Sequence, residues 1–321
     1  MMHTIHIGRR ALLLLIAEAW AVSAAAQVSR AKSIRLVVPF PPGGSSDTLG
    51  RLMAQGLSER LKQPVVVENR AGAGTVIGTD VVAKSQPDGA TLLLTTPALA
   101  INATLRAGML PYEMKDIEPV ITLAEVPMAI YASPSSGFKD LDSVIQAARA
   151  RPGTVSYGTA GEGSTGQLTM KMLEQAAGVE FEHVPFQGSA PSINALLGGH
   201  VQLAVDTAFF GSQYVALGKL IGVVTLGKSR SARLAQTPTA LEAGVPVESS
   251  AWFGIALRAG THRPTIDMLN ENFREVLGQP AVREGLERDG FEVIADKAPE
   301  AQARFAREFA KTAAALRTET K

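Results

Sequence analysis

Short apolar runs alternate with segments of helical periodicity along most of the chain. The apolar runs have strand length and little polar alternation, so both faces of each strand are expected to be buried. The predicted strands are Ile34–Phe40, Pro64–Glu68, Thr91–Thr95, Thr154–Tyr157, Phe181–Pro185, Val201–Asp206, Leu220–Leu226 and Trp252–Leu257. Helical spacing predicts helices at Leu49–Leu61, Leu141–Ala150, Gly166–Ala177 and Ile193–Leu197. This alternation predicts an α/β fold with largely parallel sheets.

The end of the chain differs, because apolar residues follow helical spacing over 266–276 and again over 305–316. The chain is therefore expected to finish with helices packed on an earlier part. Proline and glycine concentrate at 127–137 and at 237–246, which marks two crossovers between lobes. We expect one lobe from residues 33–126 and 248–321 and the other from residues 127–247, with a ligand cleft between them.

Residues 1–26 have the pattern of an export signal. Arg9 and Arg10 precede an apolar run, and Ala24-Ala25-Ala26 forms a small-residue cleavage site before Gln27. The apolar run is too short to cross a bilayer as a helix. We expect cleavage after Ala26 and a periplasmic protein, with both the general and the twin-arginine export route open.

The charge balance excludes one class of partner. The chain has 31 basic and 30 acidic residues, and the predicted signal carries two of the former and one of the latter. The mature chain would be neutral, so no basic excess attracts nucleic acid. The chain has no cysteine, which excludes disulfides, thiolate nucleophiles and cysteine-held metals. We expect a monomer without a metal or cofactor.

The strongest local signal for a ligand lies between the first predicted strand and helix. A proline- and glycine-rich loop, Pro41–Ser46, leads into a helix that is expected to open near Asp47. Free backbone amides at a helix N-terminus favour an anion, and Gly43 and Gly44 would let a ligand approach the backbone. Every βα unit needs such a turn, however, so an anion site and a plain turn both remain open.

Three further glycine motifs occur. Gly161–Gly166 follows a strand and opens a helix, which fits a dinucleotide site or a second anion-binding helix N-terminus. The hydroxyls of Ser164 and Thr165 suit a small carboxylate, so we favour the anion site. Gly72–Gly78 misses the dinucleotide spacing and is interpreted as a tight turn. Gly222–Ser229 matches the P-loop letters, but its variable positions are themselves the predicted strand, so nucleotide binding is not expected there.

Two acids stand out near predicted strand and helix ends. Asp47 lies in the first turn of a helix, where it could cap the helix or receive a ligand. Asp206 ends an apolar strand at the carboxyl edge where α/β sheets place their sites. His183 could act as a general base, but no nucleophile is predicted beside it, and the chain lacks the G-x-S-x-G motif. The residues therefore predict no catalytic site.

Ten segments in collinear order carry a family resemblance over essentially the whole mature chain. They are Val37–Asp47, Val65–Gly78, Pro87–Leu94, Ile101–Leu105, Leu110–Val120, Ser156–Leu168, Val184–Pro191, Leu196–Asp206, Pro238–Pro246 and Trp252–Leu257. With these segments the chain resembles the substrate-binding proteins of tripartite tricarboxylate transporters, the Bug family of periplasmic receptors. The resemblance implies a type II periplasmic binding protein fold, in which two α/β lobes are joined by a double crossover hinge and the C-terminal helices pack on the first lobe.

The resemblance also implies a site. The loops at Pro41–Asp47 and Thr159–Thr165 would face one another across the cleft and hold a carboxylate through backbone amides, hydroxyls and water. The ligand-binding residues that it implies in the first lobe are Phe40, Gly43, Gly44, Ser45 and Asp47. Those in the second lobe are Thr159, Gly161, Gly163, Ser164, Thr165, Gln187, Gly188 and Asp206.

We therefore expect a non-enzymatic periplasmic receptor for a small organic carboxylate, which it delivers to integral membrane transporter subunits. A dicarboxylate, hydroxy acid, acidic amino acid or aromatic acid would fit. Two alternatives stay open, namely a sensory receptor that feeds a signalling partner and a dinucleotide-linked enzyme using Gly161–Gly166. Many relatives have histidine where this chain has Gln167, so its specificity is expected to differ. Trp252, at the second crossover, is expected to change its emission on closure.

Overall fold

The computed structural model describes residues 33–317, and the predicted export signal lies outside them. In chain order the elements are β1 (Ile34–Val38), α2 (Ser45–Leu61), β2 (Val65–Asn69), η1 (Ala73–Thr75), α3 (Val76–Ala83), β3 (Thr91–Thr95), α4 (Pro97–Leu105), η2 (Met114–Asp116), β4 (Ile117–Ala132), η3 (Pro134–Ser136), α5 (Leu141–Ala150), β5 (Ser156–Thr159), α6 (Thr165–Ala177), β6 (Glu182–Pro185), α7 (Ser189–Leu197), β7 (Leu203–Thr207), α8 (Ala208–Ala216), β8 (Ile221–Thr225), η4 (Ala232–Leu234), β9 (Ser250–Arg258), α9 (Arg263–Gly278), α10 (Pro280–Arg288), β10 (Glu292–Val293) and α11 (Ala298–Arg317). In this part of the chain, no helix combines the length and hydropathy needed to cross a membrane.

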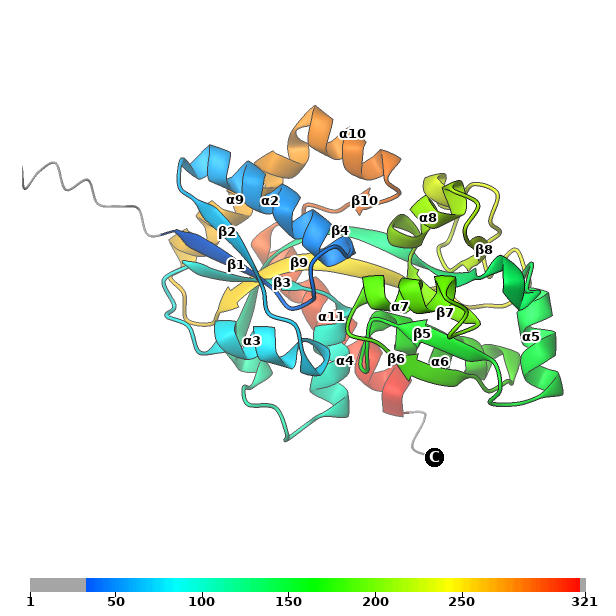
Figure 1. Ribbon diagram of the computed structural model, residues 1–321. Helices are drawn as coiled ribbons and strands as arrows, with labels where there is room; N and C mark the ends of the chain where they lie inside the picture. The colour runs from blue at the N-terminus through cyan, green and yellow to red at the C-terminus, as the bar shows by residue number, and fades with distance from the viewer. Residues whose placement is uncertain (1–32, 318–321) are drawn as a thin grey trace, which may run out of the picture.

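The strands form two halves that share β4. The strand order is β2-β1-β3-β9-β4-β7-β5-β6, and β8 and β10 also pair with β4. Residues 117–127 of β4 pair with β9, whereas residues 128–132 pair with β7 and β8. We call β1, β2, β3, β9, β10 and their helices the first half, and β5 to β8 with α5 to α8 the second half. Figure 1 shows the two halves side by side, with β4 and β9 running between them.

The predicted α/β class is confirmed, with one difference in strand direction. The outer strands are parallel, as predicted, in the pairs β1–β2, β1–β3, β5–β6 and β5–β7. The strands that connect the halves are antiparallel, since β4 pairs antiparallel with β9 and with β7. The C-terminal helices pack where they were expected, with α9 against α2 and α11 against β4 and α4. The parallel pairs place the helix N-termini of each half at one edge of its sheet.

The longest strand, β4, was not predicted from the sequence. It contains Pro119 and Pro127, and proline normally argues against a central strand because it lacks a backbone N–H. The structure accommodates Pro119 next to a register shift in the pairing with β9. Pro127 lies where β4 changes its partner from β9 to β7 and β8. The predicted lobe boundaries lie beside this change of partner and stay a prediction.

Candidate functional site

A cavity lies between the two halves, at the N-terminal ends of several helices. Its volume is about 70 Å³, and it opens to solvent. Hydroxyl residues from the starts of α2, α4, α6, α7 and α8 line it, together with apolar residues from both halves. The lining residues are Phe40, Pro41, Pro42, Gly44, Ser45, Ser46, Thr96, Ala98, Met128, Ala160, Ser164, Thr165, Gly166, Ser189, Ala190, Pro191, Val205, Asp206, Thr207, Ala251 and Phe253.

The chemistry of this lining favours an anion without supplying a cation. Lysine, arginine and histidine are all missing from the lining, and Asp206 is its single ionisable residue. The first amides of each helix have no partner within the helix and carry its partial positive charge. Amides and hydroxyls from several helix starts can therefore hold a carboxylate by hydrogen bonds alone.

Polar contacts connect the two halves around the cavity. The hydroxyls of Ser45 and Thr207 lie 2.7 Å apart, although these residues are 162 positions apart in the chain. Deeper in the structure, Nδ2 of Asn102 donates to the carbonyl oxygens of Gly74, at 2.6 Å, and Gly163, at 3.1 Å. Asn102 belongs to α4 of the first half and Gly163 to a loop of the second, so the side chain joins the halves directly.

The structure brings about half of the predicted site residues to the cavity. Phe40, Gly44, Ser45, Ser164, Thr165 and Asp206 line it. Gly43, Asp47, Thr159, Gly161, Gly163, Gln187 and Gly188 do not. Sequence reasoning missed four polar lining residues, namely Ser46, Thr96, Ser189 and Thr207. Two of them, Thr96 and Thr207, stand at the end of a strand just before a helix, which is a signal that could have identified them.

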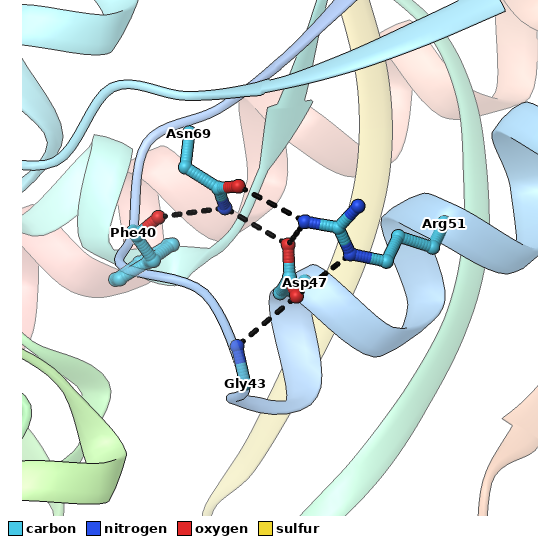
Figure 2. A network of polar contacts seen from close by, with 5 residues as sticks. All are labelled: Phe40, Gly43, Asp47, Arg51 and Asn69. Atoms are coloured by element: carbon cyan, nitrogen blue, oxygen red, sulfur yellow. Dashed lines mark hydrogen bonds and ion pairs between the residues drawn. The ribbon is translucent and has the colours of Figure 1, made fainter.

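Asp47 does not line the cavity but forms hydrogen bonds that hold the first glycine loop, Pro41–Ser46 (Figure 2). Its carboxylate accepts hydrogen bonds from the Gly43 amide at 3.0 Å, from Arg51 Nε at 2.9 Å and from Asn69 Nδ2 at 2.9 Å. The Asn69 amide also donates to the Phe40 carbonyl oxygen at 3.0 Å. Burial alone would raise the pKa of Asp47, but the hydrogen bonds and the Arg51 charge outweigh it and hold the pKa below its usual value. The carboxylate therefore fixes the loop that lines the cavity.

Replacing Asp47 tests this role. Asp47→Ala leaves the Gly43 amide without its acceptor and removes the carboxylate partner of Arg51 and Asn69, so we expect a loss of about 1–3 kcal/mol of unfolding free energy and weaker ligand binding. Urea unfolding and ligand-induced thermal shifts measure both effects. Asp267→Ala is the matched control, because Asp267 pairs with Arg263 at the same helical spacing on the exposed face of α9. It should change stability by no more than about 0.5 kcal/mol. If both variants changed stability and ligand affinity equally, Asp47 would have no special role in holding the loop.

Asp206 is the buried acid of the cavity. Its Oδ1 accepts the Thr207 amide at 2.7 Å. Burial raises the pKa of Asp206 to about 6, and hydrogen bonds from Ser189 and Thr207 offset part of this rise. Near neutral pH this group lies close to its titration point, and its charge faces whatever occupies the cavity.

The second glycine motif does not have the geometry that a dinucleotide needs. The Gly161 amide donates to Thr159 Oγ1 at 3.2 Å, and the Gly163 amide donates to Gln167 Oε1 at 2.8 Å. These backbone donors are thus engaged behind the loop and cannot cradle a pyrophosphate. Among residues 33–317, no group of three or more histidine and acidic side chains could hold a metal ion.

Comparison with known proteins gives a consistent result. Residues 49–320 match the family described as tripartite tricarboxylate transporter family receptor. Protein BugT of Bordetella pertussis is 36% identical over 264 residues, which cover 81% of this chain and 81% of BugT. The structure of R. palustris Rpa4515 with adipate has a TM-score of 0.84 at 32% identity, and covers 89% of this chain and 96% of that one. MatC from Rhodopseudomonas palustris with bound malate has a TM-score of 0.82 at 29% identity, covering 88% and 98%.

Proposed function

The chain belongs to the tripartite tricarboxylate transporter receptors of the Bug family, and from this premise we propose that it captures a small organic carboxylate and delivers it to integral membrane transporter subunits. The family consists of periplasmic binding receptors, which confirms the predicted fold and the prediction of a receptor in place of an enzyme. The dinucleotide-linked enzyme is thereby excluded. We propose a periplasmic location for this chain as well, which the family's periplasmic receptors support, and the export signal stays a prediction.

One observation carries the proposal. Hydroxyls and amides from five helix starts converge on a cavity whose lining has no cationic side chain. Such a lining suits one or two carboxylate groups of a compact ligand, because each can be held by several neutral donors at the positive ends of helices. The similar proteins Rpa4515 and MatC were solved with adipate and malate, which supports the same ligand class for this chain.

We further propose that the observed arrangement is the closed form of a two-lobed receptor. The lobes would be residues 33–126 with 248–321 and residues 127–247, as the sequence predicts. The contacts from Ser45 to Thr207 and from Asn102 to Gly163 join these lobes and would break on opening. A ligand that touches both lobes binds the closed form better, so it shifts the population toward closure. The closed form is then the state that the membrane subunits recognise.

A ligand panel tests this function. Malate, adipate, aspartate and benzoate cover the four proposed ligand classes, and NAD and ATP serve as controls. At 100 times its dissociation constant, a true ligand should stabilise the protein by about 2.7 kcal/mol, which thermal unfolding and calorimetry detect. Trp252 is buried at the start of β9, between the halves, and its emission should change with closure. Binding of NAD or ATP without any binding of a carboxylate would contradict the proposal.

A further inference from the structure

A chain of hydrogen bonds that passes through a histidine holds the second glycine loop, residues 159–165. The Gly163 amide donates to Gln167 Oε1 at 2.8 Å, and Gln167 Nε2 lies 3.2 Å from His183 Nδ1. On the other side of the ring, His183 Nε2 lies 2.7 Å from Thr159 Oγ1. The Thr159 hydroxyl then donates to the Gly161 carbonyl oxygen at 3.1 Å. Both ends of the loop are thus connected through one imidazole.

The direction of these bonds fixes the tautomer of His183. The Gln167 oxygen is used by a backbone N–H, so its amino group is the part that faces Nδ1. An amide amino group can only donate, and Nδ1 must therefore be unprotonated. The ring proton is then on Nε2 and is donated to Thr159, whose own proton goes to the Gly161 carbonyl. The bond from Gln167 Nε2 to Nδ1 is the one that requires a neutral imidazole, because a doubly protonated ring would still donate its Nε2–H to Thr159.

The surroundings of His183 also favour the neutral ring. The imidazole is half-buried and stacks on Tyr157 of β5, with ring centroids 5.0 Å apart. Burial lowers the pKa of His183 and the charge of Lys171 adds to this, while Glu162 and Glu174 act in the opposite direction. Lys171 and Glu174, both on α6, form an ion pair with each other at 2.8 Å.

A proton on Nδ1 would disrupt the chain of bonds. It would place an N–H against the amino group of Gln167, so two donors would face each other and the bond would be lost. Gln167 could then move away and release the Gly163 amide. Ser164 and Thr165, which follow Gly163 directly, line the cavity, and the Gly163 carbonyl accepts the bond from Asn102 that joins the halves. Protonation of His183 would therefore affect both the cavity lining that binds the ligand and the contact between the halves.

We propose that His183 is a positioning residue for ligand binding: in its neutral form it holds the second glycine loop through Gln167 and Thr159, and its protonation releases the loop and weakens carboxylate binding. This inference rests on the proposed function. It assigns a role to a histidine that does not touch the ligand, and it makes capture of the carboxylate dependent on pH.

The first measurement needs no ligand. Nitrogen-15 NMR of the imidazole, assigned with the His183→Gln variant, should show the Nε2–H tautomer in the free protein.

The affinity for the panel carboxylate that binds most tightly is then measured by calorimetry from pH 8 to pH 5. It should be constant above about pH 6.5, the usual pKa of histidine, and fall below it by at most tenfold per pH unit, as expected for one proton. These titrations use the Asp206→Asn background, because Asp206 itself titrates near pH 6.

Gln167→Glu is the decisive variant. A glutamate can still accept the Gly163 amide, and its second oxygen can accept a proton carried by Nδ1. It should therefore raise the pKa of His183 and preserve the loop, so that affinity is retained at low pH. His200→Gln, which replaces an exposed histidine outside this network, should leave the profile unchanged. An Nδ1–H tautomer, or an acid loss of affinity that Gln167→Glu leaves unaltered, overturns the inference. If no panel carboxylate binds at any pH, the proposed function fails; if one binds independently of pH, only this inference fails.

Discussion

Gly163→Ala is expected to weaken carboxylate binding about ten- to a hundredfold, equivalent to roughly 1–3 kcal/mol of overpacking. A Cβ at position 163 would lie 2.5 Å from both Nδ2 and Oδ1 of Asn102, which is closer than real Cβ contacts allow. Asn102 belongs to the first half and Gly163 to the second. The clash therefore exists only while the halves are together, so the substitution would destabilise the proposed closed form specifically.

A matched control separates this clash from backbone strain. Gly163 has a φ of +68°, which disfavours any L-residue, so part of the effect would be local. Gly153 has a φ of +69°, and a Cβ there would meet nothing within 4 Å. Gly153→Ala should therefore lower the free energy of unfolding by about as much as the backbone strain at Gly163 does, and it should leave the affinity for the carboxylate unchanged. Calorimetric titration of both variants makes the comparison. Equal affinities in the two variants would show that closure does not need the contact between Asn102 and Gly163.

Asp206→Asn is expected to change the pH dependence of stability. The pKa of Asp206 is raised from 3.8 in the unfolded chain to about 6 in the folded protein, so folding favours the protonated carboxyl. Its contribution to stability is therefore complete below about pH 3.8 and is lost as the pH rises through 6. The shift corresponds to a cost on the order of 3 kcal/mol at pH 8, where the carboxylate is buried and charged. The asparagine side chain carries no charge, so the variant lacks this destabilisation.

Urea unfolding at pH 4 and pH 8 tests this sign. The variant should be more stable than the wild type at pH 8, by up to roughly 3 kcal/mol, and close to it at pH 4. A purely anionic ligand should also bind the variant more tightly at pH 8, because a like charge has been removed from the cavity. Asp142→Asn, on the exposed first turn of α5, should show neither effect. If the stability difference between the variant and the wild type is smaller at pH 8 than at pH 4, this expectation is wrong.

The parts of the fold that could be predicted are those with local signals. Thr91–Thr95 and Leu141–Ala150 were predicted with the boundaries that β3 and α5 have, because apolar periodicity and clear flanking residues mark them. The helices α3, α4 and α8 were missed, since their residues are largely buried and they lack an amphipathic pattern. Strand β4 was missed because its prolines are tolerated only through a register shift and a change of partner, which are properties of the assembled sheet.

The residues of the site can likewise be divided into those that have a local signal in the sequence and those that do not. The two glycine loops are visible in the sequence because each stands between a strand and a helix. The sequence alone leaves the role of Asp47 open between helix capping and ligand binding, and the structure shows a third arrangement in which its carboxylate accepts hydrogen bonds from Gly43, Arg51 and Asn69. Ser189 lies in the lining beside Asp206 of β7, with which its side chain forms a hydrogen bond. No local pattern contains such contacts.

A crystal structure with the tightest-binding panel carboxylate tests the location of the site most directly. A carboxylate group should lie in the cavity between the halves, with its oxygens within hydrogen-bond distance of donors at the N-terminal ends of α2 and α6. The bonds from Ser45 and Asn102 to the second half, or ligand-bridged equivalents, should still connect the halves. A ligand bound elsewhere, for example in the groove lined by Lys228 and Trp252, would contradict the assignment of the site.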